Sequence, residues 1–286
     1  MRIEFDHVSC TYPMGIVGLD DMTATVEGGL IGVLGHNGSG KTTLIRILAG
    51  VMPPSSGEVR IDGSPPVVGR RTRLSFFPQE LPNFPLAQTP RQTLEHSLLL
   101  AGASDESRRA QMAADLLELV GLLAVADRAV GTFSGGMKQK VRIAQSLVHN
   151  PSALILDEPT TGLDVKERLI ILRLLHRLSE RIPVVFSTHD CHDAAAVCDA
   201  LLILSGGTLI ATGTPEALTA RAAGKVWEWW ARDIDTVQED GPFVTRLHRY
   251  AAGILVRAVT ATPPPEALEV TPTLEDAYAL LTHARS

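Results

Sequence analysis

Residues 30–43 read Leu-Ile-Gly-Val-Leu-Gly-His-Asn-Gly-Ser-Gly-Lys-Thr-Thr, and this stretch decides the fold of the chain. It fills every fixed position of the phosphate-binding loop G-x-x-x-x-G-K-[ST], namely Gly35, Gly40, Lys41 and Thr42. The apolar residues 30–34 are typical of a buried strand, and residues 42–49 have the pattern of a helix. Because the motif requires a strand before the loop and a helix after it, the sequence predicts a nucleoside triphosphate site rather than a chance glycine-rich turn.

Each residue type in this loop suits phosphate chemistry. Glycines let the backbone bend so that successive N–H groups point at phosphate oxygens, and the helix start adds its positive end. The Lys41 ammonium would reach the β- and γ-phosphates, and the Thr42 hydroxyl would ligate Mg²⁺. The predicted nucleotide contacts in the loop are Gly35, His36, Asn37, Gly38, Ser39, Gly40, Lys41, Thr42 and Thr43.

The bulk composition is that of an ordinary globular protein. At 286 residues, with 45% hydrophobic and 20% charged residues, the chain can hold one large α/β domain and a small appendage. The formal net charge of −6 argues against a broad nucleic-acid surface. No apolar run approaches the ~20 residues of a membrane span, the start is no signal peptide, and three scattered cysteines suit a reducing compartment. We therefore expect a cytoplasmic protein that reaches a membrane only through a partner.

Strand-like and helix-like stretches alternate in an order that predicts an α/β fold with a mostly parallel sheet. Residues 2–34 alternate like strands, residues 88–150 form an inserted helical block, and strands then alternate with helices again. We expect residues 1–220 to form the main domain and residues 221–286 a small accessory region with strands. Because the phosphate loop lies outside this accessory region, we expect the region to be dispensable for nucleotide binding.

Polar side chains follow three further predicted strands. In parallel sheets, ligands bind beyond the carboxyl ends of the strands, so these side chains are expected to share one crevice with the phosphate loop. They are Gln79 after residues 74–77, Asp157 and Glu158 after residues 153–156, and His189 after residues 184–187.

Asp157 and Glu158 form a carboxylate pair at the end of an apolar strand. Without other signals, such a strand end is usually only solvated. After a phosphate loop, however, we expect Asp157 to lie near Mg²⁺ and Thr42, and Glu158 to take a proton from the attacking water.

Residues 134–137, Ser-Gly-Gly-Met, precede a predicted helix. A serine cap followed by glycines exposes the N–H groups of a helix start, which suits a second anion site. Taken alone, a plain capped helix explains the same pattern more simply.

Together these motifs resemble the ATP-binding subunit of an ABC transporter, over about residues 2–220 and with every family motif in the family's order. Residues 133–139, Phe-Ser-Gly-Gly-Met-Lys-Gln, match the LSGGQ-type signature. The other matches are Tyr12 to the aromatic residue that stacks on adenine, Gln79 to the Q-loop, residues 162–164 to the D-loop and His189 to the switch histidine. The predicted fold is a P-loop NTPase (RecA-like) α/β core with an N-terminal antiparallel β subdomain, an inserted α-helical subdomain and a small C-terminal β-containing appendage.

The resemblance implies a dimer, because in this family two such domains pair head to tail and share each ATP. A second ATPase subunit, in a homodimer, would place its signature against this chain's nucleotide through Ser134, Gly135 and Gly136. His189 would contact the γ-phosphate, and Gln79 would couple nucleotide and metal to a transmembrane permease. The expected catalytic residues are Lys41, Gln79, Glu158 and His189, and the expected metal ligands are Thr42, Gln79 and Asp157.

Two further likenesses narrow the expected function. Phe133 and Met137 replace the leucine and glutamine of the consensus signature, and this form resembles the subfamily that serves ABC-2-type permeases, most of them bacterial exporters of drugs, antibiotics or lipids. Residues 272–278, Pro-Thr-Leu-Glu-Asp-Ala-Tyr, resemble the tail of the same subfamily. We therefore expect the Mg²⁺-dependent ATPase subunit of an exporter on the inner face of the cell membrane, without a nucleic-acid partner or membrane insertion of its own.

One alternative is an ABC-type ATPase acting on ribosomes or DNA, but such proteins typically carry two ATPase domains or a long coiled-coil insertion, and this sequence shows neither. Another is a nucleotide-binding module that no longer hydrolyses, but the intact Lys41, Asp157, Glu158 and His189 argue against it.

Two groups of residues admit a second interpretation. Residues 189–193, His-Asp-Cys-His-Asp, superficially suggest metal ligands, but a capped helix start explains the same residue types. Trp227 and Trp229 share one face of a predicted strand, and we expect them in a core rather than on an exposed partner surface.

Overall fold

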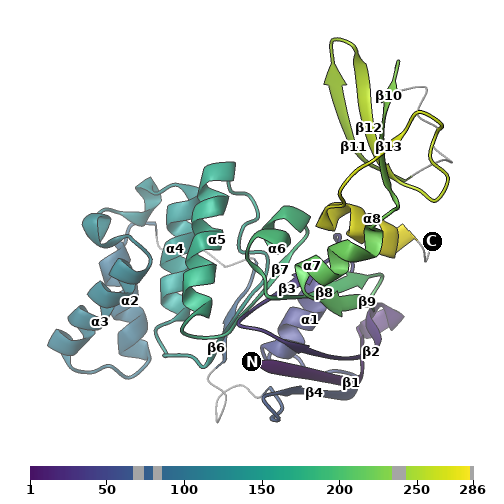
Figure 1. Ribbon diagram of the computed structural model, residues 1–286. Coiled ribbons are helices and arrows are strands. Elements are labelled where there is room, and N and C mark those ends of the chain that lie inside the picture. The colour runs from purple at the N-terminus through teal and green to yellow at the C-terminus, as the bar shows by residue number, and fades with distance from the viewer. Residues whose placement is uncertain (67–73, 80–85, 234–242, 284–286) are drawn as a thin grey trace.

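A computed structural model describes residues 1–66, 74–79, 86–233 and 243–283 (Figure 1). The strands are β1 (Arg2–Thr11), β2 (Val17–Glu27), β3 (Leu30–Leu34), β4 (Ser56–Ile61), β5 (Leu74–Phe77), β6 (Ala153–Leu156), β7 (Val184–Thr188), β8 (Ala200–Ser205), β9 (Thr208–Gly213), β10 (Val226–Ala231), β11 (Phe243–Tyr250), β12 (Gly253–Val259) and β13 (Leu268–Glu269). The α-helices are α1 (Lys41–Leu48), α2 (Pro90–Leu100), α3 (Glu106–Leu119), α4 (Gly135–Ser146), α5 (Val165–Ser179), α6 (Cys191–Val197), α7 (Pro215–Thr219) and α8 (Leu274–His283).

The central sheet has six strands in the order β5-β6-β7-β3-β8-β9. All neighbouring pairs are parallel except β8 and β9, which are antiparallel. Every residue of β3, β6 and β7 is buried, as expected for short apolar strands covered on both faces. The mostly parallel α/β sheet predicted from the sequence is therefore confirmed.

A second, antiparallel sheet of order β2-β1-β4 forms the amino-terminal β subdomain. Its inward side chains, among them Ile3 and Phe5, belong to the same buried cluster as Leu44 and Ile45 of α1 and Ile31 of the central sheet. Helix α1 is thus fixed between two sheets, which holds the loop before it in one place.

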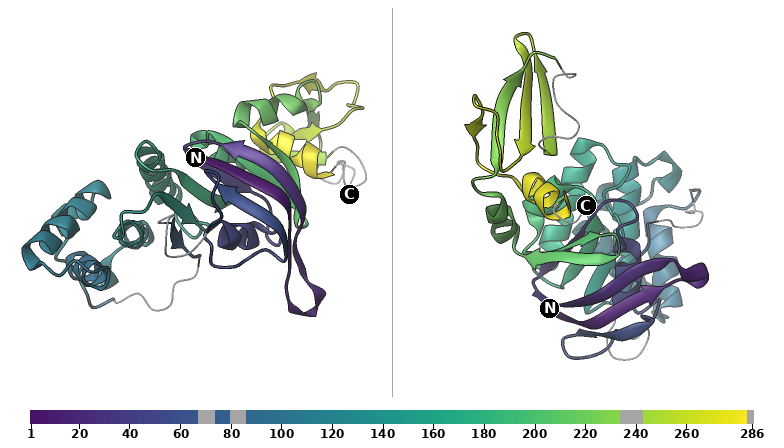
Figure 2. Two further views of the ribbon diagram at one scale, coloured as in Figure 1. Left: turned by 90° about the horizontal axis from the view of Figure 1, so that it is seen from below. Right: turned by 90° about the vertical axis from the view of Figure 1, so that its right-hand side faces the viewer.

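The inserted helical block contains α2, α3 and α4. Thr89 caps α2 in a capping box with Gln92, and Pro90 occupies the first turn. Asp105 caps α3 by accepting the Arg108 N–H. In Figures 1 and 2, α2 and α3 lie at one end of the molecule and strands β10–β13 at the other.

The C-terminal module consists of an antiparallel sheet, in the order β11-β12-β10-β13, and helix α8. Strands were expected in this region and are present, whereas α8 was not predicted. Leu274 of α8 is buried in the main core cluster, and Tyr278 and Leu281 pack against that cluster. The module therefore turns back onto the main domain, with α8 between its sheet and α7 (Figure 1).

The expectation that Trp227 and Trp229 are core residues is wrong, because both are only half-buried. Val226 and Val259 share a buried cluster with Ala277 of α8, so the covered face of the sheet is the one toward this helix. Because successive side chains of a strand point to opposite faces, Trp227 and Trp229 lie on the other face of the sheet. Within the described residues, no helix is long and apolar enough to cross a membrane.

Candidate functional site

A cleft of about 480 Å³ lies beside the phosphate loop. It brings together ten of the predicted site residues with four that were not predicted. The predicted ones are Tyr12, Asn37, Gly38, Gly40, Lys41, Thr42, Thr43, Gln79, Glu158 and His189, and the others are Ile16, Val17, Gly18 and Thr161. Gly35, His36, Ser39 and Asp157 lie in the adjoining loop and strand end, whereas Ser134, Gly135 and Gly136 do not line this cleft.

The loop has little room for side chains at its glycines. Gly40 caps α1 in the left-handed region, with φ +99°, and a Cβ there would collide with the Gly18 carbonyl oxygen. A Cβ on Gly35 would collide with the Ser39 hydroxyl and the Leu204 carbonyl oxygen. The backbone of the loop can therefore approach a ligand closely, while its far side is packed against neighbouring strands.

Lys41 is held at the mouth of the loop by three oxygen atoms. Its Nζ donates to the carbonyl oxygens of Gly35 (2.9 Å) and His36 (3.0 Å). It also lies 3.3 Å from Oε1 of Glu158, and both side chains are more than nine-tenths buried. A buried ammonium in this setting is a cation ready to attract phosphate oxygens.

Glu158 adopts a positive φ of 46°, in the turn that follows β6. Its Oε2 accepts a hydrogen bond from the Thr161 hydroxyl at 2.6 Å and lies 3.4 Å from Nδ1 of His189. Burial opposes ionisation of this carboxyl, but the Thr161 hydroxyl and the Lys41 ammonium outweigh it and lower the pKa of Glu158. The side chain is therefore a carboxylate at neutral pH.

Ser187, at the end of β7, links the two carboxylate residues and was not predicted as a site residue. Its hydroxyl donates to Oδ1 of Asp157 at 2.6 Å and accepts the backbone N–H of Glu158 at 2.8 Å. The signal was a serine within the otherwise apolar strand 184–187, since a buried hydroxyl needs partners. Ser187 thus fixes the positions of both Asp157 and the Glu158 backbone.

Tyr12 lines the cleft from the turn between β1 and β2. Its hydroxyl lies 3.0 Å from Oγ1 of Thr43, which ties the ring to α1. Ile16 and Val17 line the cleft beside it, although both are exposed on the surface of the chain. An aromatic ring and two apolar side chains at one end of a phosphate cleft suit a planar base.

The signature segment, residues 133–139, does not line this cleft. The Ser134 side chain caps α4 by accepting the N–H of Met137 at 3.3 Å, and Ser134 and Gly135 are exposed. Gly136 packs so closely on Glu167 of α5 that a Cβ would collide with it. The expected capped helix start is therefore confirmed.

Gln139 of α4 connects the signature helix to the cleft and was not predicted. Its Nε2 donates to the carbonyl oxygen of Pro159 at 2.7 Å, and the side chain is buried. Because Pro159 follows Glu158 directly, this hydrogen bond joins the helical block to the carboxylate end of β6.

Residues 189–193 form a capped helix start. Oδ1 of Asp190 accepts the N–H groups of His192 and Asp193. The carboxylates of Asp190 and Asp193 both pair with Arg168 of α5. These contacts account for the residue types that had suggested metal ligands.

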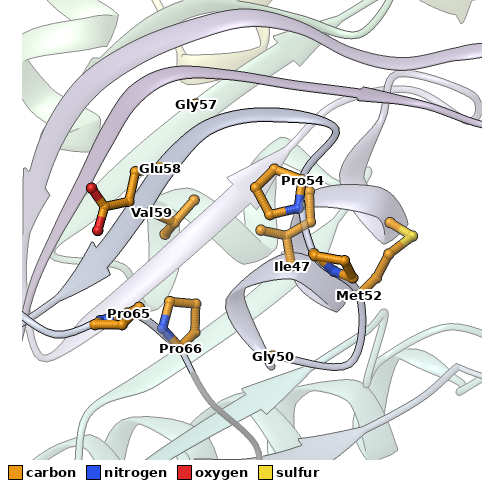
Figure 3. A pocket seen from close by; sticks show the side chains of 10 residues that line it. Ile47, Gly50, Met52, Pro54, Gly57, Glu58, Val59, Pro65 and Pro66 are labelled. Atoms are coloured by element: carbon orange, nitrogen blue, oxygen red, sulfur yellow. The ribbon is translucent and has the colours of Figure 1, made fainter.

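A second hollow, of about 490 Å³, lies between the end of α1 and β4 (Figure 3). Its lining is mostly apolar, and Glu58 is the one titratable residue among the described residues that line it. Figure 3 shows Ile47, Met52, Pro54 and Pro66 around it. In the described part of the chain, no side chain that lines this hollow carries a positive charge.

The sheet, the glycine-rich loop between β3 and α1, and the carboxylate pair after β6 define the class of P-loop ATPase domains. The family model described as ABC transporter matches residues 19–161. The uncharacterized ABC transporter ATP-binding protein YxlF of Bacillus subtilis (strain 168) is 33% identical over 222 residues, which are 77% of this chain and 74% of the relative. This chain belongs to the ABC transporter family and is an ATP-binding subunit with ATPase activity.

Other similar proteins are named for opposite directions of transport, one for export and one for import. Nod factor export ATP-binding protein I of Paraburkholderia xenovorans (strain LB400) is 38% identical over 269 residues, which are 91% of this chain and 87% of the relative. Methionine import ATP-binding protein MetN 2 of Burkholderia mallei (strain ATCC 23344) is 36% identical over 196 residues, which are 65% of this chain and 49% of the relative. A solved dimeric, post-hydrolysis structure of the ATP-binding cassette MJ0796, bound to ADP and Pi, has a TM-score of 0.64 and 28% identity, and the match covers 74% of this chain and 98% of that chain.

Proposed function

We propose that this chain hydrolyses ATP with Glu158 as the proton acceptor and powers export through a separate transmembrane permease. The observation that carries the catalytic part is the position of the Glu158 carboxylate, 3.3 Å from Nζ of Lys41 and 3.4 Å from Nδ1 of His189, at the cleft beside the phosphate loop. A lowered pKa keeps this carboxylate ionised, which is the form that accepts a proton from water.

The other cleft residues bind and orient ATP in this proposal. The loop N–H groups and Lys41 hold the β- and γ-phosphates, His189 contacts the γ-phosphate, and Tyr12 stacks on adenine. When a phosphate takes over the Lys41 ammonium, Glu158 loses part of a cationic partner and becomes a stronger base. Binding of the nucleotide thus prepares its own hydrolysis.

The donor set beside the loop fits magnesium. A hydroxyl (Thr42), an amide oxygen (Gln79) and a carboxylate (Asp157) are oxygen ligands of the kind that Mg²⁺ prefers. When bound, the ion would neutralise charge on the phosphate oxygens. Ser187 holds the Asp157 carboxylate in a fixed position, which suits a ligand.

The exposed start of α4 supports a head-to-tail dimer. Ser134 and Gly135 present hydrogen-bond donors to the surface, outside the cleft that Lys41 and Glu158 line. A helix start of this kind binds anions, and the nucleotide of a second copy supplies one. The dimeric state of the similar cassette MJ0796 agrees with this arrangement.

The extent of the sequence match supports export. The relative named for Nod factor export matches 91% of this chain, whereas the relative named for methionine import matches 65%. The Phe133 and Met137 form of the signature and residues 272–278 resemble the subfamily of ABC-2-type permeases. In this proposal the chain is cytoplasmic, lies on the inner face of the membrane through its permease, and leaves the substrate path to that permease.

Transport in vesicles tests this proposal. A tagged Glu158→Gln chain, which we expect to retain ATP, should co-purify with its permease from solubilised membranes in MgATP. Inside-out vesicles that contain the wild-type pair expose the ATPase to added ATP, so export appears as ATP-driven uptake from a panel of drugs and lipids. Vesicles with Lys41→Ala are the control. ATP-driven release of a preloaded compound would mean import and would overturn the proposed direction.

A further inference from the structure

The C-terminal helix reaches the phosphate loop. The phenolic oxygen of Tyr278 accepts a hydrogen bond from the backbone N–H of His36 at 3.0 Å, across 242 positions of sequence. Backbone N–H groups are the donors with which such a loop holds phosphate, so their directions decide how well it binds. The Tyr278 phenol therefore fixes the His36 peptide group, and with it the course of the loop backbone, from outside the main domain.

Two opposite faces of helix α8 make contacts with different parts of the molecule. Leu274, Tyr278 and Leu281 are four and three positions apart, which puts them on one side of the helix, against the main core. Asp276 is two positions from Tyr278, or about 200° around the helix axis. The helix therefore contacts the main domain with one side and the module's own sheet with the other.

Asp276 joins α8 firmly to that sheet. Its side chain is fully buried and accepts hydrogen bonds from the guanidinium of Arg257 on β12 (2.8 Å) and the hydroxyl of Thr245 on β11 (2.7 Å). It also accepts the backbone N–H of Thr273, at 2.8 Å. Because a buried carboxylate with this many partners is costly to separate from them, α8 and the sheet move as one body.

The module touches the nucleotide domain at a second place. Nη2 of Arg246 pairs with Oε2 of Glu275 at 2.8 Å and lies 3.4 Å from Nε2 of His192. His192 belongs to α6, which begins two residues after His189. The module therefore contacts both the phosphate loop and the segment that follows the cleft histidine.

We propose that Tyr278 is a positioning residue for the phosphate loop, and that through it the C-terminal module sets the nucleotide affinity of the cleft. This inference rests on nucleotide binding at the cleft and not on the direction of transport. It also removes the reason for expecting residues beyond 220 to be dispensable for nucleotide binding, since one of them orients the loop.

Replacing one hydroxyl tests the proposal. Tyr278→Phe keeps the ring packing of α8 and removes the acceptor for the His36 N–H. We expect ATP and ADP to bind about 2- to 10-fold more weakly to the full chain, because a single hydrogen bond is exchanged for one to water. The matched control is Tyr250→Phe, which removes an exposed hydroxyl from the same module. The control should bind like the wild type.

Hydrogen exchange separates positioning from general destabilisation. In Tyr278→Phe without nucleotide, the His36 amide should exchange faster while the thermal midpoint stays that of the control. By reciprocity, saturating ATP should slow exchange in residues 274–283 of the wild type. Wild-type affinity in Tyr278→Phe would overturn the inference, as would an affinity loss that follows a fall in the thermal midpoint without a local change at His36. A wild-type chain that binds no ATP would instead contradict the proposed function.

Discussion

Helices α1 and α4 both begin at glycine-rich segments, but the surroundings of the two helix starts differ. The start of α1 is enclosed: Gly40 lies against Gly18, and the carbonyl oxygen of Ser39 accepts the Gly207 N–H at 3.1 Å. The start of α4 is open, with Ser134 and Gly135 exposed. The same local motif is therefore built into a cleft in one case and left at the surface in the other.

The two helix starts also differ in the charged side chains beside them. The α1 site has a cation, Lys41, and a carboxylate, Glu158, which form an ion pair. The α4 site offers donors on the surface and lies outside that cleft. We infer that the first binds a phosphate chain unaided and the second acts on a nucleotide held by another copy. The following variants test that division.

The largest effect is expected for Lys41→Ala, which removes the cation of the α1 site. Hydrolysis should fall by about 100-fold or more and nucleotide binding should weaken, because the phosphates lose their charged donor. Lys225→Ala removes the same charge from an exposed position and should have no effect. Phosphate release and nucleotide titration measure both quantities. Wild-type hydrolysis in Lys41→Ala, with the permease present, would contradict the assignment of the cleft.

The α4 site is tested by introducing a negative charge at Ser134. The test uses the Glu158→Gln variant, which we expect to hydrolyse ATP slowly. This variant should form a dimer in MgATP. Adding Ser134→Asp should weaken the dimer at least about 10-fold, because it places a negative charge against the partner's phosphates. Adding Ser134→Asn is the control, since aspartate and asparagine both cap a helix about as well as serine but only aspartate is charged.

Light scattering with and without MgATP measures this dimer. Equal dimerisation of the Ser134→Asp and Ser134→Asn chains would mean that α4 does not face phosphate. A Glu158→Gln chain that hydrolyses ATP rapidly would remove Glu158 from catalysis.

A smaller effect is expected at the base end of the cleft. Tyr12→Ala should raise the Michaelis constant for ATP by about 5-fold or more and change turnover less, because stacking supports binding rather than chemistry. Tyr12→Phe keeps the ring but loses the contact with Thr43, so it should stay near the wild type. Steady-state kinetics with the three chains decide this. An unchanged constant in Tyr12→Ala would place the adenine contact elsewhere.

The smallest effect concerns pH. The Thr161 hydroxyl lowers the pKa of Glu158, so Thr161→Val should raise that pKa. Because the base must be ionised, the acid limb of the rate–pH profile should move to higher pH, with little change at its plateau. Thr161→Ser retains the hydroxyl and should keep the wild-type profile. A limb that does not move in Thr161→Val would exclude Glu158 as the titrating group.

The sequence predicted several strands and helices of the main domain well because the ends of these elements are chemically marked. The bounds of β3, β5 and β6 agree with the apolar runs, each of which ends at a turn or a polar residue. Thr89 and Asp105 marked helix starts through their capping side chains. The residues of the cleft follow strand ends, and a parallel sheet brings such ends together.

The missed features depend on contacts between distant parts of the chain. Ser187 and Gln139 act through partners about 20 to 30 positions away, and no local pattern names those partners. Helix α8 did carry a local signal, since Thr273 and Asp276 cap its start reciprocally. What the pattern could not give was the target of Tyr278, which depends on how the module folds back.

The bond between Tyr278 and His36 has a consequence for synthesis. A ribosome adding about 5–20 residues per second needs roughly 12–48 s to cover the 242 positions between them. Because β3 pairs with β7 and β8, the loop gains its place in the sheet only after β8 is complete at Ser205, so it lacks the Tyr278 phenol for the last part of that interval. The newborn loop must therefore hold its shape without the contact that later adjusts it.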